Sequence, residues 1–453
     1  MAKTELPKLP AGPKGPGRFG AYYTHLTWDP EWDRPWRVAD HPDVVVRFED
    51  GGHRLVFWRG TSYIPCWVTD NGKWFTNEFV ERRGHQSPNT KGCCEPMSDK
   101  QCRYSHVRII ESTPARAVVH WRYSPVDVHY RQPFIDPETN WGDWVDEYYT
   151  IYPDSTTIRK VQVQTSRPDL WMEFHEAIVV NQPGSMPEDS IELDALEVAN
   201  MAGESATYTW TKDGAPPLDE FWARWDANIM RINLKAKRVP YSIVPPHSEY
   251  GLLITPYGGH APTSHFNFWN HWPVSQVASD GTLAKTPNRP SHSSLAHYDL
   301  LELASARWPA YEEGPQSRTK LMLTGMTSGR AAGLVPIAKS WLCPAEVEAG
   351  ADAGARYEGF DPAQYAYRFS MDSTTPASKL SFALAASQEQ TAIRPAFVVT
   401  GWGDREAKVS LAGKALADGA DARTGLVHTL DGTELVVWLN RELAKETKVT
   451  ITA

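Results

Sequence analysis

The stretch from Asp43 to Gly60, DVVVRFEDGGHRLVFWRG, decides the fold class. Two runs of alternating apolar and polar residues flank an Asp-Gly-Gly turn, which is a pattern typical of a β-hairpin. The same pattern returns in Cys66–Val80, around an Asp-Asn-Gly turn, and in His106–Pro125. Because runs of this kind continue to the end of the chain, we expect an all-β protein.

Two short stretches, Leu218–Arg231 and Ala331–Ser340, are the best helix candidates. Ala345–Glu358 is rich in Ala, Gly and acidic residues and poor in apolar ones, so it predicts a domain boundary. We expect an N-terminal extension over residues 1–19, a large antiparallel β domain over residues 20–345 and a small β-sandwich over residues 355–453.

The strand series VVVRFEDGGHRLVFWRG, RAVVHWRY and DEYYTIYPDSTTIRK resembles the galactose-mutarotase-like β-supersandwich of carbohydrate-active enzymes. In that fold, large stacked antiparallel sheets carry sugar-active sites on a concave face, and several polysaccharide lyases place a smaller β-sandwich after it. The resemblance implies a β-supersandwich and a sugar-active function. The alternative fold is a β-propeller, although no fixed repeat of roughly 40 to 50 residues is visible.

Composition limits the classes of function. The formal net charge of −9 gives no electrostatic support to a nucleic-acid partner. No apolar run is long enough to predict a membrane span. The N-terminus has no apolar signal core, so the chain as written is expected in the cytoplasm, or in the periplasm or outside the cell if an export signal has been removed. The 19 tryptophans favour a carbohydrate partner, because sugar rings stack on aromatic faces. Oligomeric state is left open.

The hairpin Asp146–Lys160 carries the first candidate site. With a four-residue turn over Pro153–Thr156, Thr150 would lie opposite Arg159, so that Tyr148 and Arg159 share a polar face. β-Elimination on a uronic acid needs a cation that neutralises the carboxylate, and groups that remove and return a proton. We expect Arg159 to neutralise the carboxylate, and Tyr148 with His85 or His106 to exchange the protons.

A second candidate wall of the sugar cleft lies in the histidine-rich, irregular stretch His265–His297. Long irregular loops on a rigid β scaffold usually bind something. We expect substrate contacts from four residues, namely Tyr208, His271, Arg289 and His292.

Three of the five cysteines, Cys93, Cys94 and Cys102, lie within ten residues and near His85 and His106. Three interpretations stay open for them, namely buried free thiols, a structural zinc site and a disulfide. None of these interpretations requires another cofactor.

These features together predict a lyase or dehydratase that acts by β-elimination on a uronate-containing oligo- or polysaccharide. A glycoside hydrolase would need a pair of carboxylates, and the candidates Glu78, Glu81, Glu173 and Glu176 show no spacing that points to a pair. A sugar epimerase could use Glu173 and His175, which a continuous strand would place on one face with Glu176 on the other. A non-catalytic carbohydrate-binding protein is the alternative from a different class.

Overall fold

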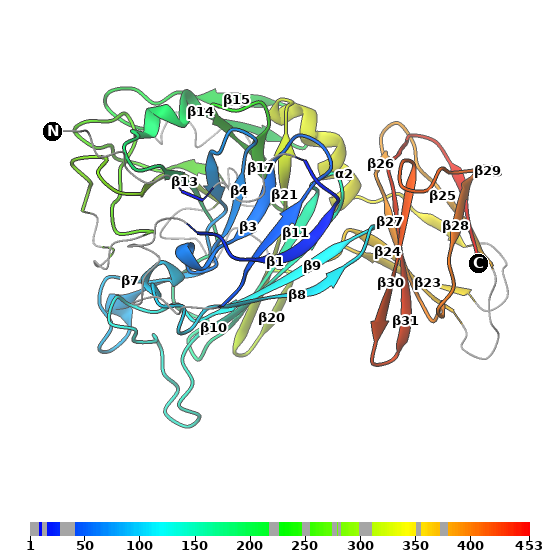
Figure 1. The fold of residues 1–453 in the computed structure, drawn as a ribbon, viewed down its shortest axis with the longest axis horizontal. Coiled ribbons are helices and arrows are strands. Elements are labelled where there is room, and N and C mark those ends of the chain that lie inside the picture. The colour runs from blue at the N-terminus through cyan, green and yellow to red at the C-terminus, as the bar shows by residue number, and fades with distance from the viewer. Residues whose placement is uncertain are drawn as a thin grey trace.

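The computed structural model describes residues 9–10, 16–27, 41–216, 226–246, 254–273, 279, 282–298, 310–349, 355–371 and 379–453. It is an all-β protein, as predicted. Figure 1 shows a large sandwich of antiparallel sheets, followed by a smaller one that contains the C-terminus. The strands form sheets of eight and ten members rather than the small blades of a propeller, so the alternative fold is wrong.

The first large sheet contains eight strands, and the hairpin predicted around the Asp-Gly-Gly turn is part of it. Val45 pairs with Val56 across that hairpin. In spatial order the strands are β1 (Gly20–Thr24), β2 (Asp43–Arg47), β3 (Arg54–Phe57), β4 (Pro65–Val68), β5 (Trp74–Thr76), β13 (Glu176–Asn181), β19 (Ser291–Tyr298) and β18 (Ile254–Pro256).

The second large sheet contains ten strands, nine of them in one continuous order. These are β15 (Ser205–Tyr208), β14 (Ile191–Asn200), β16 (Ala227–Leu234), β17 (Val239–Ile243), β21 (Ser317–Thr327), β11 (Thr157–Gln164), β10 (Trp144–Ile151), β9 (Ala117–Tyr123) and β8 (His106–Ser112), with β20 (Glu312–Gly314) paired to β21. β16 begins at Ala227, so the predicted helix Leu218–Arg231 is wrong from residue 227 onward. Residues 217–225 lie outside the described residues.

A small third sheet joins β12 (Met172–Glu173), β6 (Glu81–Arg83) and β7 (Cys93–Cys94). Short 3-10 turns connect the strands at η1 (Arg59–Thr61), η2 (Gly84–Gln86), η3 (Pro96–Ser98) and η4 (Pro187–Asp189). The main core lies between the two large sheets, where the inward side chains of both meet. Phe57 of β3 and Tyr149 of β10 illustrate this contact, because their rings meet edge to face at 5.3 Å.

The C-terminal part has two five-stranded sheets and one two-stranded sheet. The first five-stranded sheet consists of β22 (Val347–Ala349), β25 (Lys379–Leu384), β33 (Thr447–Thr452), β28 (Lys408–Leu411) and β29 (Lys414–Ala415). The second consists of β23 (Ala355–Asp361), β24 (Ala366–Met371), β27 (Ala396–Thr400), β31 (Gly432–Leu439) and β30 (Ala422–Thr429). The two-stranded sheet pairs β26 (Ala392–Ile393) with β32 (Glu442–Leu443). Every pairing is antiparallel except that of β24 with β27.

A short helical segment links the two parts of the chain. It consists of η6 (Ala331–Leu334) and α2 (Val335–Leu342), which confirms the helix predicted there. Trp341 of α2 belongs to a second core, which also contains Leu323 of the ten-stranded sheet and Val398 of the C-terminal part. Among the described residues, no helix is long and apolar enough to cross a membrane.

The hairpin of β10 and β11 has a different register from the predicted one. Ile151 pairs with Thr157 and Tyr149 pairs with Arg159. Ser155 has a positive φ of 73°, and the turn closes with a hydrogen bond from the Tyr152 N–H to the Thr156 carbonyl, so the loop is one residue shorter than we assumed. A shift of one residue moves a side chain to the other face. The prediction that Tyr148 and Arg159 share a face is therefore wrong.

Candidate functional site

Arg159 points into the core. Its side chain is fully buried, and Nε and Nη2 donate to the Glu147 carboxylate at 2.7 and 2.8 Å. Nη1 donates to the carbonyl oxygens of Asn77 and Phe174 at 3.0 and 2.8 Å. With these partners Arg159 is a structural ion pair, and burial keeps it from a substrate carboxylate.

The opposite, outward face of the same strands carries a group of polar side chains. In one row across β8, β9 and β10, Arg108 pairs with His120, which pairs with Tyr148. In the neighbouring row His106 pairs with Arg122. Because residues two apart share a face, these five side chains lie on one surface.

Three of them, His106, Arg108 and Arg122, line a cleft of about 510 Å³, which we call the basic cleft, and Tyr148 lies beside it on the same face. Its charged and titratable lining comes from His41, Arg103, His106, Arg108 and Arg122, and its aromatic lining includes Tyr23, Tyr104 and Trp144. Trp141, with 59% of its surface exposed, lies beside Trp144 at a ring distance of 6.3 Å. The cleft thus combines positive charge with aromatic faces, as an acidic sugar requires.

A hydrogen-bonded network orders the floor of this face. Arg108 Nε donates to His120 Nδ1 at 3.0 Å, so the other ring nitrogen of His120 carries the proton that it shares with Asp146 at 2.7 Å. Burial alone would raise the pKa of Asp146, but the hydrogen bonds from His120 and Arg122 outweigh it and lower that pKa. Tyr148 stacks on the His120 ring with a centroid distance of 4.5 Å. The hydrogen-bonded His120 ring therefore holds the Tyr148 ring in place by stacking.

The two candidate proton-transfer groups have pKa values on opposite sides of neutrality. Burial, together with the positive charge of Arg108, lowers the pKa of His106, so its ring is neutral at pH 7 and can accept a proton. Burial, together with the charge of Asp146, raises the pKa of Tyr148, so its hydroxyl keeps its proton.

A second group of titratable residues lies where the chain crosses from the small third sheet to the eight-stranded sheet. Met172 and Glu173 pair with β6, whereas Glu176 begins the pairing with β19. The strand that we predicted as continuous is therefore broken at 174–175. As a result Glu173 and Glu176 point to the same place rather than to opposite faces.

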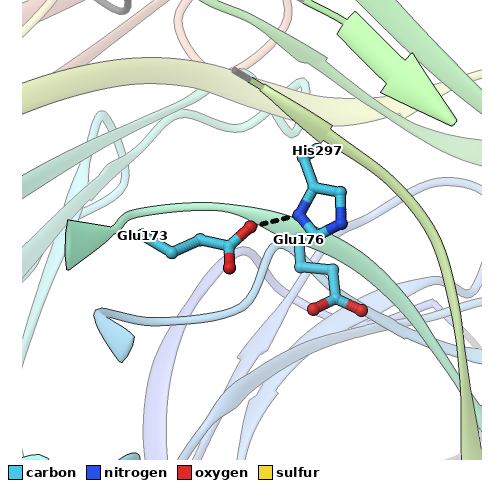
Figure 2. Close-up of side chains that lie close together, drawn as sticks. All are labelled: Glu173, Glu176 and His297. Atoms are coloured by element: carbon cyan, nitrogen blue, oxygen red, sulfur yellow. Dashed lines mark hydrogen bonds and ion pairs between the residues drawn. The ribbon is translucent and has the colours of Figure 1, made fainter. Parts of the chain in front are cut away.

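Glu78, Glu81, Glu173, Glu176 and His297 form what we call the carboxylate cluster. Glu173, Glu176 and His297 each present a ligand atom within 4.8 Å of the others, and so do the four glutamates among themselves. Figure 2 shows the hydrogen bond between Glu173 and the His297 ring, with the Glu176 side chain beside them. All are buried except Glu81, which is partly buried.

Burial and mutual repulsion dominate the electrostatics here. Burial, with the charges of Glu173 and Glu176, raises the pKa of Glu78 well above its ordinary value. Burial, with the charges of Glu95 and Glu173, does the same to the pKa of Glu81. The pKa of Glu176 rises to about 7, mainly through burial and although His297 opposes the rise. Carboxylates so close together need either protons or a cation.

A cavity of about 250 Å³ adjoins the carboxylate cluster, with Glu78, Glu95 and Glu176 in its wall. Two predicted substrate contacts, His271 and His292, also line it, together with Tyr257 and Trp269. The His271 and His292 rings meet edge to face at 4.6 Å. Burial lowers the pKa of both, to about 3 for His292, so both rings are neutral at pH 7.

The other predicted site residues lie apart from both places. His85 is exposed in η2. Tyr208 is buried on β15, at the edge of the ten-stranded sheet opposite to β8. Arg289 is half-buried, and its Nε donates to Asn288 at 3.2 Å.

Within the described part of the chain, Cys93, Cys94 and Cys102 do not come together as a group of metal ligands. Cys93 and Cys94 are successive residues of β7, and Cys102 donates its thiol to the carbonyl of Arg59 at 3.4 Å. All five cysteines of the chain are free thiols. No group of three potential ligands in the described residues includes a cysteine, and the candidate metal ligands are those of the carboxylate cluster.

Sequence reasoning missed the roles of Arg108, His120 and Arg122, although a signal was present. The alternation in residues 106–123 places Arg108 beside His106, and His120 beside Arg122, on one face of a hairpin. The carboxylate cluster had no comparable signal, because its members come from separate segments that meet only in three dimensions.

No family model and no curated protein matches this chain. The solved structures with a weak similarity to this chain include the following three. A galactose 1-epimerase from Lactobacillus acidophilus NCFM is 8% identical with a TM-score of 0.30, over 68% of this chain and 99% of that one. An alpha-mannosidase from Enterococcus faecalis V583 is 8% identical with a TM-score of 0.30, over 88% and 42%. A protein in the glycosyl hydrolase family 38 from Enterococcus faecalis is 9% identical with a TM-score of 0.30, over 88% and 44%. The chain spans less than half the length of the last two.

Proposed function

We propose that this protein is a carbohydrate-active enzyme that cleaves a uronate-containing oligo- or polysaccharide by β-elimination in the basic cleft. The observation that carries the proposal is the shared face of Arg108, Arg122, His106 and Tyr148, fixed by the register of β8, β9 and β10. These side chains supply a carboxylate partner, a base and an acid on one open surface.

The reaction requires one proton to leave and one to return. A base removes the hydrogen at C5, next to the carboxylate, and the electron pair of that bond forms the C4=C5 double bond. The bond from C4 to the glycosidic oxygen breaks, and an acid protonates the departing oxygen. Negative charge gathers on the carboxylate in between, so a nearby cation lowers the barrier.

The residues of the basic cleft, together with the neighbouring Tyr148, match these steps. Arg108 and Arg122 are the cations for the carboxylate, and they replace Arg159 in that role. His106 is the base, and Tyr148 is the acid. Tyr148 lies two strands away from His106 across the sheet and two residues further along the strand direction. Their Cα atoms are therefore about 12 Å apart. A sugar ring held between the two side chains can bridge that separation.

A group of aromatic side chains lies in and beside the cleft. Trp144 lies under the guanidinium of Arg122 at 4.8 Å, and Tyr104 lies beside Trp144 at 6.2 Å. Exposed Trp141 continues this group. Flat apolar faces next to cations suit neighbouring sugar units, so the substrate is an oligomer or polymer rather than a single uronic acid.

Ultraviolet absorbance of the unsaturated product tests the proposal on a panel of uronate-containing glycans. We expect a rise with the wild-type protein and a loss of about a hundredfold or more in kcat for Tyr148→Phe and for His106→Ala. Arg167→Ala removes an exposed arginine outside the cleft and should leave the rate unchanged. Full sugar affinity without turnover would instead indicate a binding protein and contradict the proposal.

A second candidate function is acid–base chemistry on an uncharged sugar, by a glycoside hydrolase or an epimerase, in the cavity beside the carboxylate cluster. Its support is the lining by Glu95, His271 and Trp269, which combines proton-transfer groups with an aromatic face. New reducing ends without ultraviolet absorbance, lost in Glu95→Gln and retained in Tyr148→Phe, would favour a hydrolase at this site over elimination.

A further inference from the structure

The carboxylate cluster concentrates more negative charge than its protein surroundings offset. Four glutamates converge in the interior, and His297 provides the one ion pair that the described residues give them. An isolated carboxylate is expensive to bury, and four together also repel one another. A folded chain that keeps such a group needs either bound protons or a cation at that point.

Glu78 gives the most direct indication that the carboxylate cluster binds a cation. Its side chain is 1% exposed, and neither carboxylate oxygen has a hydrogen-bond partner among the described residues. One of those oxygens is a member of the four-glutamate group, so the side chain points into the cluster. Buried polar atoms are nearly always paired, and an unpaired carboxylate aimed at other carboxylates is typical of a cation ligand.

The surrounding structure holds this arrangement in place. The buried guanidinium of Arg159 binds the carbonyls of Asn77 and Phe174, which directly precede Glu78 and directly follow Glu173. Glu78 itself has a positive φ of 60°, an uncommon conformation for a residue other than glycine. The backbone is thus fixed so that the carboxylates remain together.

We propose that Glu78, Glu81, Glu173, Glu176 and His297 bind one divalent cation of the Mn²⁺ type. Carboxylate oxygens suit Mg²⁺, Ca²⁺ and Mn²⁺, whereas an imidazole nitrogen suits the transition metals, and Mn²⁺ satisfies both preferences. The hydrogen bond between Glu173 and His297 orients the imidazole, as carboxylates commonly do for histidine ligands. The site is separate from the basic cleft and does not depend on the chemistry proposed there.

Calorimetric titration of EDTA-treated full-length protein with MnCl₂ tests this proposal. We expect one Mn²⁺ per chain, and at least about tenfold weaker binding in Glu78→Gln and in Glu81→Gln. Glu197→Gln changes a buried, ion-paired glutamate outside the cluster and should leave the affinity unchanged. Mg²⁺ and Ca²⁺ should bind more weakly than Mn²⁺ because neither prefers the imidazole.

Thermal unfolding gives a second readout that a misfolded variant cannot imitate. Mn²⁺ at about a hundredfold excess over its Kd should raise the unfolding midpoint of the wild type by about 5 °C. Without metal, Glu78→Gln should unfold at a higher temperature than the wild type, because it removes the cost of burying one of four neighbouring carboxyl groups. No saturable Mn²⁺ binding by the wild type, or equal affinities in Glu78→Gln and Glu197→Gln, would overturn the proposal. Neither result would affect the test of elimination.

Discussion

At the scale of single residues, Arg159 shows how a candidate for catalysis becomes a structural residue once its surroundings are known. The hairpin predicted from the sequence places it on a polar face with Tyr148, as a substrate-binding arginine would be placed. In the structure it forms a buried ion pair with Glu147 and holds two backbone carbonyls. The presence of an arginine in this hairpin was known from the sequence, but its burial could not be predicted. A shift of one residue in the strand register decides which face of the sheet the Arg159 side chain occupies.

Arg159→Ala should destabilise the protein by about 3 to 5 kcal/mol, because it leaves the buried Glu147 carboxylate without its counter-charge. Arg122→Ala, which removes a partly exposed partner of Asp146, should cost no more than about 1 kcal/mol. Urea unfolding measures both. If Arg159→Ala lost no more stability than Arg122→Ala, the assignment of Arg159 to the core would be wrong.

His106 should set the acidic limb of the pH–rate profile. Burial and Arg108 lower the pKa of His106 below 6.5, so activity rises with pH through that lower value as the ring loses its proton. Arg108→Ala removes the positive charge, so the midpoint of this limb should move upward towards 6.5. The midpoint of kcat/KM measures this whatever the loss in rate, and an unchanged midpoint would exclude His106 as the base.

At the scale of elements, hairpins were predictable and the places where the chain changes sheet were not. The turn at 50–52 and the alternation around it define β2 and β3 without knowledge of the rest of the chain. The break between β12 and β13 depends instead on two different partners, β6 and β19. Because the carboxylate cluster lies at that break, its geometry could not be derived from local sequence pattern.

The hairpin of β6 and β7 should tolerate no side chain at Gly84. A Cβ added there would lie 2.3 Å from the carbonyl oxygen of Gly92, so the backbone that carries Glu81 must move. We expect Gly84→Ala to cost about 1 to 3 kcal/mol and to weaken Mn²⁺ binding. Gly333→Ala adds a Cβ in open space and should change neither quantity, as urea unfolding and calorimetry will measure. A neutral Gly84→Ala would contradict the tight approach of the two strands.

At the scale of the whole molecule, opposite charges gather at two separate places on one all-β scaffold. The basic cleft lies on the outward face of the ten-stranded sheet, and the carboxylate cluster lies in the interior beside the eight-stranded sheet. The alternation of apolar and polar residues predicted the fold class, and the net charge gave no electrostatic support to a nucleic-acid partner. A net charge of −9 says nothing of this separation, which depends on how distant segments pair.

In EDTA, the free energy of unfolding should fall as the pH rises from about 6.5 through about 7. Burial raises the pKa of Glu176 to about 7 and the pKa values of Glu78 and Glu81 well above their ordinary value, so the folded chain holds protons that the unfolded chain has released. Stability is then lost as the pH rises, by about 1.4 kcal/mol per pH unit for each such proton. In this window the buried histidines are mostly neutral in both states.

Urea unfolding at several pH values measures how the free energy of unfolding changes with pH. In Glu78→Gln this slope should be smaller by the contribution of one proton. A stability that stayed constant or rose across the window in EDTA would show that the glutamates are ionised in the folded protein without a cation. That result would contradict the electrostatic description of the carboxylate cluster.

Mass spectrometry of the products from a defined uronate-containing oligosaccharide, cleaved in water enriched in heavy oxygen, tests elimination in the basic cleft most directly. Elimination breaks the chain without adding water, so we expect products whose masses add up to that of the substrate, no heavy oxygen in either, and no products with Tyr148→Phe. Products that together exceed the substrate by one molecule of heavy water would instead prove hydrolysis and contradict the proposed function.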